Sequence, residues 1–564
     1  MQAKTLTDDL SVSPQLTVAD VAEAKAAGFR SIIINRPDGE AADQPSHADI
    51  ETAARQAGME TRYIPVVLGK LAKQDVEAFA NAMSSLPKPV IGFCKSGTRT
   101  ATLWAMSEAG NRPSQDIEGA AKAAGYDVSA ALTARLGESD RGASKSNTSR
   151  SHDVVIVGAG ASGIALAASI LSRKPGLDIA IIDAADAHYY QPGWTMVGRG
   201  VFSAAETRRD MASLIPNGVK WIKERVASFQ PDAKTVTLES GAAVSYRKLV
   251  VAPGLKLNWS AIEGLEETLG KNGVTSNYRY DLAPYTWELV QQFRGGNALF
   301  TQPPMPIKCA GAPQKAMYLS CDHWLATGAL GKSKVEFLNA GPVLFGVADY
   351  VPPLMEYVKR YGIGLSFGHN LVKIDGAAKR AWFKTTPKEG EPQIVERSFD
   401  MIHVTPPQSS PDFVKSSPLA NEAGWVDVDP GTLRHVRYPD IYSLGDAMGA
   451  SNAKTAAAAR KQAPVVAENL LRDMGSASTS QPAIYDGYGS CPLTVERGKV
   501  ILAEFAYGGR RVPSFPKWFI DDLKPSKAAW MLKERVLPKI YWQAMLKGRE
   551  LMAKPQHTTA QAAE

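Results

Sequence analysis

Cys309 is the residue of this 564-residue sequence whose neighbours point most directly to chemistry. Lys308 and Lys315 flank it, and nearby ammonium groups favour the thiolate, the form of cysteine that reacts with disulfides and flavins. A cysteine of a large enzyme is often an inert buried side chain instead, so its neighbours alone leave both alternatives open. Cys321 and Cys491 follow later in the chain.

Cys94 begins a second candidate site. The segment from Val90 to Leu103 has the pattern of a strand, a loop and a helix. This pattern places the thiol among backbone N–H groups at a helix N-terminus, and Lys95 and Arg99 add positive charge. Because all three effects lower the pKa of a thiol, we predict a reactive cysteine here.

The Cys94 loop resembles two kinds of anion-binding loop. Tyrosine-phosphatase-like enzymes place five residues between cysteine and arginine, whereas four separate Cys94 from Arg99. The shorter spacing is similar to that of rhodaneses, whose loop holds a persulfide. The surrounding region, with Asn35-Arg-Pro-Asp-Gly-Glu, resembles the phosphatase-like domain of beta-lactamase-hydrolase-like proteins, in which Asp38 would be a general acid. The short loop favours sulfur transfer, and phosphate hydrolysis remains the alternative.

A dinucleotide site is predicted by the strand Val154–Val157 and the glycine turn that follows it. Gly158 permits the tight turn, Gly160 lets the backbone approach a pyrophosphate, and Gly163 allows close packing of helix and strand. The pyrophosphate would lie at the helix N-terminus, where free N–H groups favour anions. Asp183, at the end of the next strand, is placed to bind ribose hydroxyls.

Two later segments resemble flavoproteins with two dinucleotide-binding domains and favour FAD over NAD. Lys248–Gly254 is similar to their strand–turn motif, and Ile441–Asp446 to the motif whose aspartate holds the ribityl chain. A helix that begins near Lys454 would stabilise negative charge on reduced flavin. The residues expected to bind FAD are Gly158, Gly160, Gly163, Asp183, Ala252, Gly254, Gly445, Asp446, Lys454 and Thr455.

In members of that superfamily that use NADH, a second glycine motif opens the middle domain. The corresponding strand here runs into Asn339-Ala-Gly-Pro, and Pro342 removes an N–H where a pyrophosphate would need one. The flavin therefore requires an electron donor other than NADH.

From about residue 152 to 550 the sequence closely resembles the sulfide:quinone oxidoreductase family, particularly its mitochondrial-like branch. The resemblance is carried by the surroundings of both Cys309 and Cys491, and by His188–Trp194, His403–Pro407, Gly445–Asp446 and Val500–Phe505. Cys321 matches no cysteine of the family, so we expect a structural role for it.

The resemblance implies a mechanism for the pair Cys309 and Cys491. Sulfide attacks a disulfide or sulfur-extended bridge between them and leaves a persulfide and a thiolate. The thiolate at the position of Cys309 reduces the flavin, a small-molecule acceptor removes the sulfur, and quinone reoxidises the flavin. Cys94 would then take the sulfur from the persulfide and hand it on.

Composition and length describe an α/β protein with several domains. With 44% hydrophobic and 21% charged residues and a net charge of +7, the chain is globular, and it lacks the motifs of nucleic-acid binders. We predict a phosphatase/rhodanese-like domain over 1–112 and short helices with a flexible linker over 113–151. A tandem Rossmann-like FAD oxidoreductase follows over 152–509, and an amphipathic membrane-binding tail over 510–564.

The tail carries Trp530, Leu537, Tyr541 and Ala544 at helical spacing among basic residues. Tryptophan and tyrosine favour the level of lipid headgroups, so an in-plane helix would hold the chain on a membrane surface. Without an apolar signal segment or a run of 18 apolar residues, we place the chain at the cytoplasmic face of a membrane. The alternative is a helix packed on its own domain or on a partner subunit.

Two other functions are alternatives to sulfide oxidation. One is a type II NADH:quinone dehydrogenase with an N-terminal protein phosphatase domain, which the missing second glycine motif and the paired cysteines disfavour. The other is a flavin-bearing redox sensor that signals without turnover.

Overall fold

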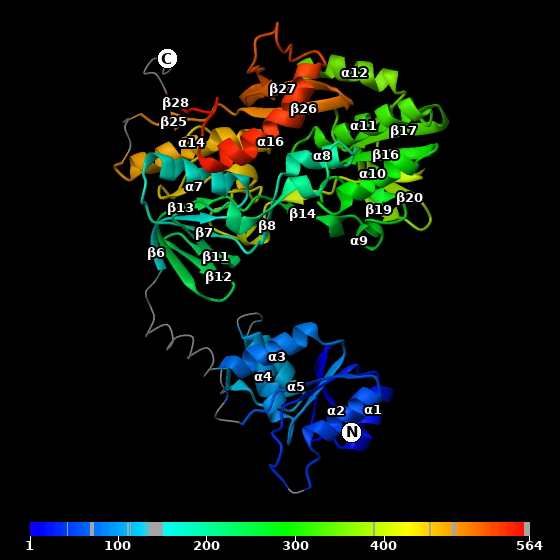
Figure 1. The fold of residues 1–564 in the computed structure, drawn as a ribbon, viewed down its shortest axis with the longest axis vertical. Coiled ribbons are helices and arrows are strands. Elements are labelled where there is room, and N and C mark those ends of the chain that lie inside the picture. Colours follow the sequence, from blue (N-terminus) through cyan, green and yellow to red (C-terminus); the bar gives the residue numbers. More distant parts are fainter. Residues whose placement is uncertain are drawn as a thin grey trace. The chain divides into compact units, whose positions relative to one another are not determined.

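The computed structural model describes residues 1–564 except 42, 68–70, 72, 110–111, 113, 130, 133–149, 387–389, 451–452, 477–480 and 558–564. The chain divides into two compact units, essentially residues 1–149 and 150–564 (Figure 1). The flexible linker predicted in the later part of 113–151 lies mainly outside the described residues, which omit 133–149.

The first unit is a five-stranded sheet with helices on both faces. Its strand order is β1 (Lys4–Thr7), β2 (Leu10–Ser13), β5 (Val90–Phe93), β3 (Ser31–Ile34) and β4 (Glu60–Tyr63), and all neighbours except β1 and β2 run parallel. Alternate isoleucines of β3 enter two separate cores. One core holds α1 (Val18–Ala26) and α2 (His47–Gln56), and the other holds α3 (Lys73–Ser85), α4 (Thr98–Glu108) and α5 (Ser114–Ala123).

This unit continues past residue 112. Ile117 and Ala121 of α5, together with Val128 and Leu132, are buried in the same core as α4. The short helices that we assigned to the connecting segment are therefore part of the first folded unit.

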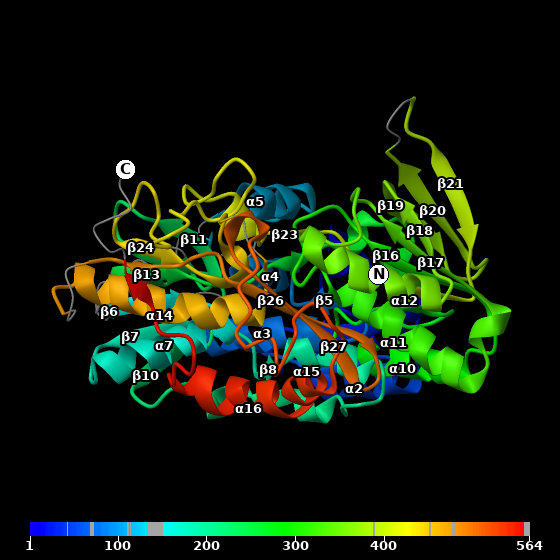
Figure 2. The same ribbon diagram turned by 90° about the horizontal axis from the view of Figure 1, so that it is seen from above.

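The second unit begins with a sheet whose central strands are parallel. Its order is β10 (Val219–Ile222), β7 (Ile179–Ile182), β6 (Arg150–Val157), β13 (Ala243–Val251), β12 (Thr235–Leu238) and β11 (Val226–Gln230), and β24 (Ile441–Ser443) also pairs with β13. Figure 2 shows α7 (Ala161–Arg173) and α14 (Ala456–Asp473) side by side on this sheet. Strand β6, the glycine turn and α7 follow one another as the sequence predicts.

A second parallel sheet holds β15 (Val274–Thr275), β22 (Met401–His403), β16 (Gly296–Gln302), β17 (Ser333–Asn339) and β18 (Gly364–Phe367) in that order. The helices α10 (Leu282–Gln292), α11 (Ala312–Thr327) and α12 (Val351–Arg360) belong to this half. An antiparallel sheet of β19 (His369–Asp375), β20 (Arg380–Thr385) and β21 (Ile394–Ser398) adjoins it, and the hairpin of β26 (Gly489–Glu496) and β27 (Lys499–Phe505) packs on α11. The mixed α/β class is confirmed.

The C-terminal segment packs on the second unit. It consists of α15 (Lys527–Met531), π-helical turns at Leu532–Val536 and Ile540–Ala544 around α16 (Leu537–Lys539), and a 3-10 turn at Met545–Lys547. Trp530 and Tyr541, which we expected at the level of lipid headgroups, are 7% and 4% exposed. No helix among the described residues is long and apolar enough to cross a membrane.

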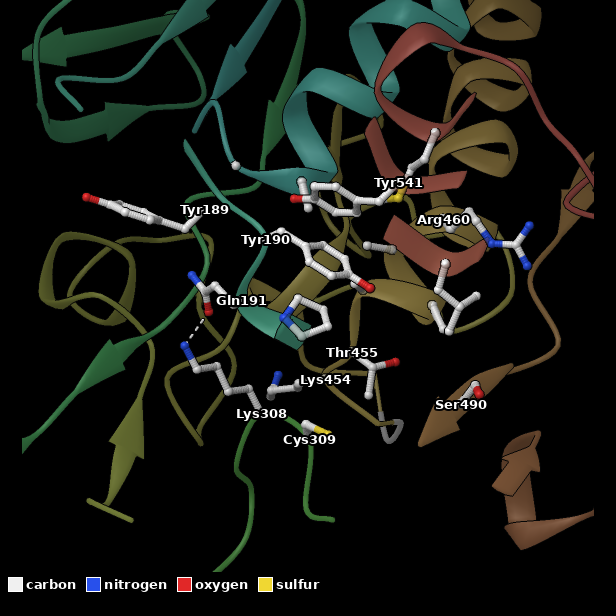
Figure 3. A pocket seen from close by; sticks show the side chains of 18 of the residues that line it. Tyr189, Tyr190, Gln191, Lys308, Cys309, Lys454, Thr455, Arg460, Ser490 and Tyr541 are labelled. Atoms are coloured by element: carbon white, nitrogen blue, oxygen red, sulfur yellow. Dashed lines mark hydrogen bonds between the residues drawn. The ribbon is translucent and has the colours of Figure 1, made fainter. Parts of the chain in front are cut away.

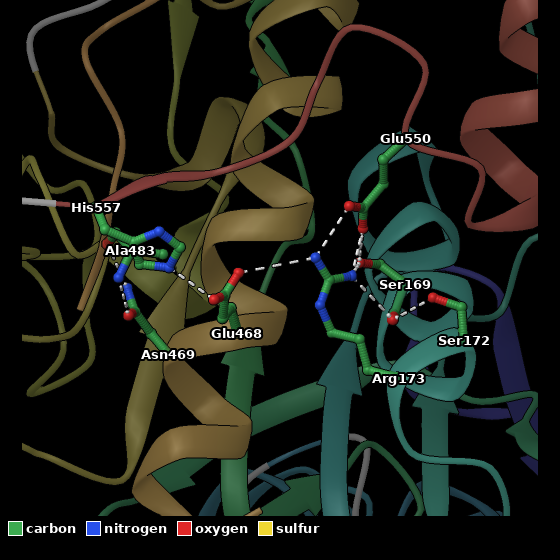
Figure 4. Close-up of polar contacts among 8 residues, drawn as sticks. All are labelled: Ser169, Ser172, Arg173, Glu468, Asn469, Ala483, Glu550 and His557. Atoms are coloured by element: carbon green, nitrogen blue, oxygen red, sulfur yellow. Dashed lines mark hydrogen bonds and ion pairs between the residues drawn. The ribbon is translucent and has the colours of Figure 1, made fainter. Parts of the chain in front are cut away.

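Ion pairs fasten the end of this segment to the dinucleotide-binding half (Figure 4). Glu550 pairs with Arg173 of α7, and His557 lies 2.7 Å from a carboxylate oxygen of Glu468 on α14. Strand β28 (Gln556–His557) pairs with β25 (Ala483–Ile484). The apolar side chains that stay exposed near this end are Trp518, Phe519, Met531, Val536, Leu551 and Met552.

We predict that Leu546→Ala destabilises the second unit by about 2–5 kcal/mol, because Leu546 is fully buried and its truncation leaves a cavity. Urea unfolding followed by circular dichroism measures the change. Met531→Ala, at a position 54% exposed, is the matched control and should stay within about 0.5 kcal/mol of the unmodified protein. An unchanged transition in Leu546→Ala would mean that the segment does not contribute to folding.

Candidate active site

A cavity of about 470 Å³ runs through the second unit from the glycine turn to Cys309 and the C-terminal segment. Figure 3 shows Lys308, Cys309 and Lys454 on one side of it and Tyr190 and Tyr541 on another. Its lining includes seven of the residues that we expected to bind FAD, namely Gly160, Asp183, Ala252, Gly254, Asp446, Lys454 and Thr455.

The three glycines of the turn have different roles. Gly158 has a φ of +101°, and a Cβ there would lie 2.4 Å from the carbonyl oxygen of Ala252. A Cβ at Gly163 would lie 1.9 Å from the carbonyl oxygen of Gly158, so this glycine allows α7 to approach the turn. A Cβ at Gly160 would meet no atom within 4 Å and would occupy the cavity. This open space beside a helix N-terminus fits the pyrophosphate of FAD.

Two acidic residues, Asp183 and Asp446, line the cavity. The carboxylate of Asp183 accepts hydrogen bonds from the N–H groups of Ala159 (2.7 Å) and Ala185 (2.8 Å). Burial raises the pKa of Asp446, and the charges of Lys454 and Lys308 oppose that shift. Two acidic residues that line the same cavity as the glycine turn fit the ribose and ribityl hydroxyls of FAD.

Lys454, Thr455 and Gly445 mainly shape the loop that carries Asp446. Lys454 donates to the carbonyl oxygens of Asp446 (2.7 Å) and Met448 (3.0 Å), and burial lowers its pKa to about 8. Thr455 caps α14 by accepting from the N–H of Ala458. Gly445 has a φ of +75°, and a Cβ there would meet the hydroxyl of Ser162.

Cys309 lines this cavity, and Cys491 lies directly behind it. Their sulfur atoms lie 3.5 Å apart, and the Nζ atom of Lys315, in the first turn of α11, lies 3.1 Å from the sulfur of Cys309. Cys309 has a positive φ of 48°, and its N–H donates to the carbonyl oxygen of Lys454. A Cβ at Gly311 would lie 2.3 Å from the sulfur of Cys491, so glycine is required for this approach.

The electrostatics assign different roles to the two sulfurs. The hydrogen bond from Cys491 and the charge of Lys315 hold the pKa of Cys309 well below its usual range, although burial opposes this. The hydrogen bond to Cys309 and burial raise the pKa of Cys491. Burial disfavours a charged Lys315, but the neighbouring sulfurs raise its pKa on balance. Cys309 is therefore the thiolate of the pair, and Lys315 its counter-ion.

Lys533 is a site residue that sequence reasoning missed. Lys533 is one of the basic residues of the tail that we predict to bind lipid. In the structure it is 6% exposed and donates to the carbonyl oxygen of Pro492 at 3.1 Å. Burial and the nearby Lys315 lower its pKa well below the ordinary value. The available signal was its spacing from Trp530, which places both side chains on one helical face.

The remaining cysteine and the second nucleotide segment are as expected. Cys321 is fully buried in α11, and burial raises the pKa of its thiol. After β17, the side chain of Asn339 accepts from the N–H of Gly341 and donates to the carbonyl oxygen of Val343. An N–H that a pyrophosphate would need is thus already bonded within the loop.

The Cys94 loop lies in the first unit, between β5 and α4. The sulfur of Cys94 accepts from the N–H groups of Gly97 (3.1 Å) and Arg99 (3.4 Å), and the residue is 1% exposed. Gly97 has a φ of +92°, and a Cβ there would meet the hydroxyl of Tyr126 at 2.1 Å. The predicted cradle of backbone N–H groups is therefore present.

Asp38 lies at the same edge of the sheet, because the chain leaves β3 next to β5. Its carboxylate accepts from the ring of His47 (2.6 Å) and from the backbone N–H of that residue (2.8 Å). The hydrogen bond from the His47 ring lowers the pKa of Asp38. A general acid requires the opposite shift.

We predict that Lys315→Met raises the pKa of Cys309 by about 1–3 units, because the thiolate loses its counter-ion. A pH series of iodoacetamide alkylation of reduced protein, read from the Cys309 peptide by mass spectrometry, measures it. Near neutral pH, labelling should slow at least about tenfold. Lys527→Met, at an exposed position of α15, removes the same charge and should leave the profile unchanged. Identical profiles for Lys315→Met and unmodified protein would exclude Lys315 as the counter-ion.

Comparisons with known proteins agree with the two units. The family model described as "Beta-lactamase hydrolase-like protein, phosphatase-like domain" matches residues 2–111. The model described as "Pyridine nucleotide-disulphide oxidoreductase" matches residues 152–286.

Relatives cover each unit separately. "Sulfide:quinone oxidoreductase, mitochondrial" from Dictyostelium discoideum is 42% identical over 399 residues, which cover 70% of this chain and 86% of that protein. "Beta-lactamase hydrolase-like protein" from Agrobacterium fabrum is 38% identical over 133 residues, 23% of this chain and 31% of that protein. The X-ray structure of the sulfide:quinone oxidoreductase from Aquifex aeolicus superposes with a TM-score of 0.60 at 20% identity, covering 70% of this chain and 92% of that one, which shows a shared fold.

Proposed function

Because the chain belongs to the sulfide:quinone oxidoreductase family, we propose that Cys309 and Cys491 are its redox pair and that Cys94 receives the sulfur they release. The enzyme oxidises sulfide and passes the electrons to quinone with FAD as its cofactor. The observation that carries the residue assignment is the pair of sulfurs 3.5 Å apart, with Lys315 beside Cys309 and Cys309 lining the cavity that fits FAD.

The first step is the attack of HS⁻ on a disulfide between Cys309 and Cys491. A new S–S bond forms on Cys491, the disulfide breaks, and its electron pair leaves on Cys309 as a thiolate. This direction follows from the shifted pKa values, because the thiol with the lower pKa is the better leaving group. Lys533, whose pKa is lowered by burial, is suited to accept the proton that HS⁻ carries.

Sulfur transfer completes the cycle. The Cys94 thiolate attacks the outer sulfur of the persulfide, an S–S bond forms on Cys94, and Cys491 leaves as a thiolate. FAD bound in the cavity would supply the acceptor for the electron pair released when Cys309 and Cys491 form their disulfide again, with quinone as the final acceptor. A small thiol or cyanide then takes the sulfur from Cys94, whose loop N–H groups stabilise the thiolate and the persulfide anion alike.

We predict that Cys309→Ser and Cys491→Ser each retain FAD but abolish sulfide-driven flavin bleaching under anoxia, because neither can form the disulfide. Cys321→Ser, at the buried α11 position, is the matched control and should bleach at a rate near that of unmodified protein. Stopped-flow absorbance measures the rates. Rapid bleaching by sulfide in either of the first two variants would remove the disulfide mechanism, and rapid bleaching by NADH would reverse the assignment of the electron donor.

We predict that the full chain gains 32 mass units on the Cys94 peptide after sulfide turnover, the increment of one sulfur atom. Cys94→Ser should lose sulfur transfer to cyanide. Peptide mass spectrometry and thiocyanate formation are the measurements. Brisk hydrolysis of aryl phosphates without sulfur on Cys94 would instead favour the phosphatase alternative.

Membrane attachment at the cytoplasmic face is also part of the proposal, and the exposed apolar side chains near the C-terminal segment support it. Trp518 is 87% and Phe519 51% exposed, and their rings lie 5.9 Å apart. Burying such side chains in a bilayer interface stabilises binding by about 1.5–3 kcal/mol each.

We predict that the double variant Trp518→Ala/Phe519→Ala sediments less with anionic liposomes and reduces long-tailed quinones more slowly, while reduction of short soluble quinones is unchanged. Val343→Ala, 53% exposed in the loop that follows β17, is the control. Unchanged sedimentation of the double variant would place the membrane contact elsewhere.

A further inference from the structure

A network of hydrogen bonds and ion pairs beside the Cys94 loop takes no part in the sulfur transfer proposed above. Gln15 accepts a hydrogen bond from Arg36 (2.9 Å), and Arg36 donates to Glu40 (3.0 Å). Glu40 in turn binds the Nη2 atom of Arg99, the arginine of the loop, at 2.8 Å. The side chains of Arg36 and Arg99 are only 6% and 13% exposed, so this network is largely removed from water.

Glu40 is ionised at neutral pH. Burial alone would raise its pKa, but the hydrogen bonds from Arg99 and Arg36 lower it below the ordinary value. A carboxylate therefore stands next to the guanidinium of the arginine whose backbone N–H binds the sulfur of Cys94.

The charges of this network add up to a small surplus. Arg36 and Arg99 contribute two positive charges and Glu40 one negative charge, so their sum is +1. That surplus balances one negative charge, such as the thiolate or persulfide anion of Cys94. A phosphate or thiosulfate dianion beside a Cys94 thiolate would bring three negative charges to the same place.

Geometry limits oxyanions as well. Arg99 recognises a tetrahedral oxyanion best when two of its N–H groups form a fork. Glu40 already holds Nη2, and the buried Nη1 atom has no hydrogen-bond partner among the described residues. One arm of the guanidinium is thus available, which suits a single sulfur atom better than a phosphate group.

We propose that Glu40 is a specificity-determining residue that restricts the Cys94 loop to the monoanionic sulfur of a persulfide and excludes divalent oxyanions such as phosphate and thiosulfate. The proposal rests on the sulfur-carrying role proposed above for Cys94. The negative charge of Glu40 would then distinguish this loop from a phosphatase loop, in addition to its shorter length.

The test uses the full chain as unmodified protein, Glu40→Gln, Glu40→Asp and Glu118→Gln. Inorganic phosphate is titrated while iodoacetamide labels Cys94, and the labelled Cys94 peptide is quantified by mass spectrometry. Glu40→Gln is nearly isosteric and removes only the charge, so phosphate should protect Cys94 at a concentration at least about tenfold lower than in unmodified protein. Thiosulfate should likewise become a better sulfur donor to Cys94 in Glu40→Gln.

Two controls separate charge from structural damage. Glu40→Asp keeps the carboxylate and should exclude phosphate as the unmodified protein does. Glu118→Gln removes one charge at an exposed position of α5 and should have no effect. Equal phosphate protection in Glu40→Gln and unmodified protein would overturn the proposal, as would relief of exclusion in Glu118→Gln.

Failure of the underlying sulfur transfer gives a different result. If Cys94 never carries sulfur, the mass increment after sulfide turnover is absent from every variant, whatever the phosphate titration shows. If Cys94 carries sulfur but the titration does not respond to Glu40, only the role of Glu40 is wrong.

Discussion

A thiolate buried in the interior of a protein needs a cation, and the ion pair of Cys309 and Lys315 is the constraint on which the rest of this site depends. An unpaired charge of either sign at this depth would cost several kcal/mol. Helix α11 supplies Lys315 from its first turn, and Gly311 leaves room for Cys491 to approach. The hairpin of β26 and β27 holds Cys491 against the same helix. The buried ion pair therefore requires that α11, this hairpin and the loop that carries Cys309 keep their relative positions.

The sulfurs of Cys309 and Cys94 have different surroundings. Cys309 relies on a buried ammonium group, which makes it a good leaving group next to the FAD cavity. Cys94 relies on backbone N–H groups and on an arginine whose charge Glu40 partly neutralises. The first arrangement favours the departure of Cys309 as a thiolate when its disulfide bond to Cys491 breaks. In the proposed function the second would suit a sulfur anion that forms and is released repeatedly, because the N–H groups would bind the thiolate and the persulfide in the same manner.

The features that could be predicted from the sequence are those encoded by neighbouring residues. The glycine turn, the defect at Pro342, the Cys94 loop and the basic flanks of Cys309 all depend on a few consecutive positions. Lys533 and Glu40 could not be assigned to their sites from the sequence. The partners that place them there, Pro492 and Arg99, are distant in the sequence, and these contacts arise from packing. The amphipathic pattern of the tail predicted a helical face correctly, yet a pattern alone does not say whether lipid or the protein covers that face.

In the structure the protein itself covers the buried face of the tail. This packing links the C-terminal segment to the glycine turn and to the sulfur pair. Burial lowers the pKa of His188, so its neutral ring donates to the carbonyl oxygen of Ala159 in the glycine turn and accepts from the hydroxyl of Tyr541. The segment that carries Tyr541 also supplies Lys533 to the sulfur pair. Removing the segment would therefore disturb the FAD cavity and the sulfur chemistry together, so its deletion cannot isolate a membrane function. Substitutions of Trp518 and Phe519 can, because those side chains are largely exposed and neither of them lines the cavity.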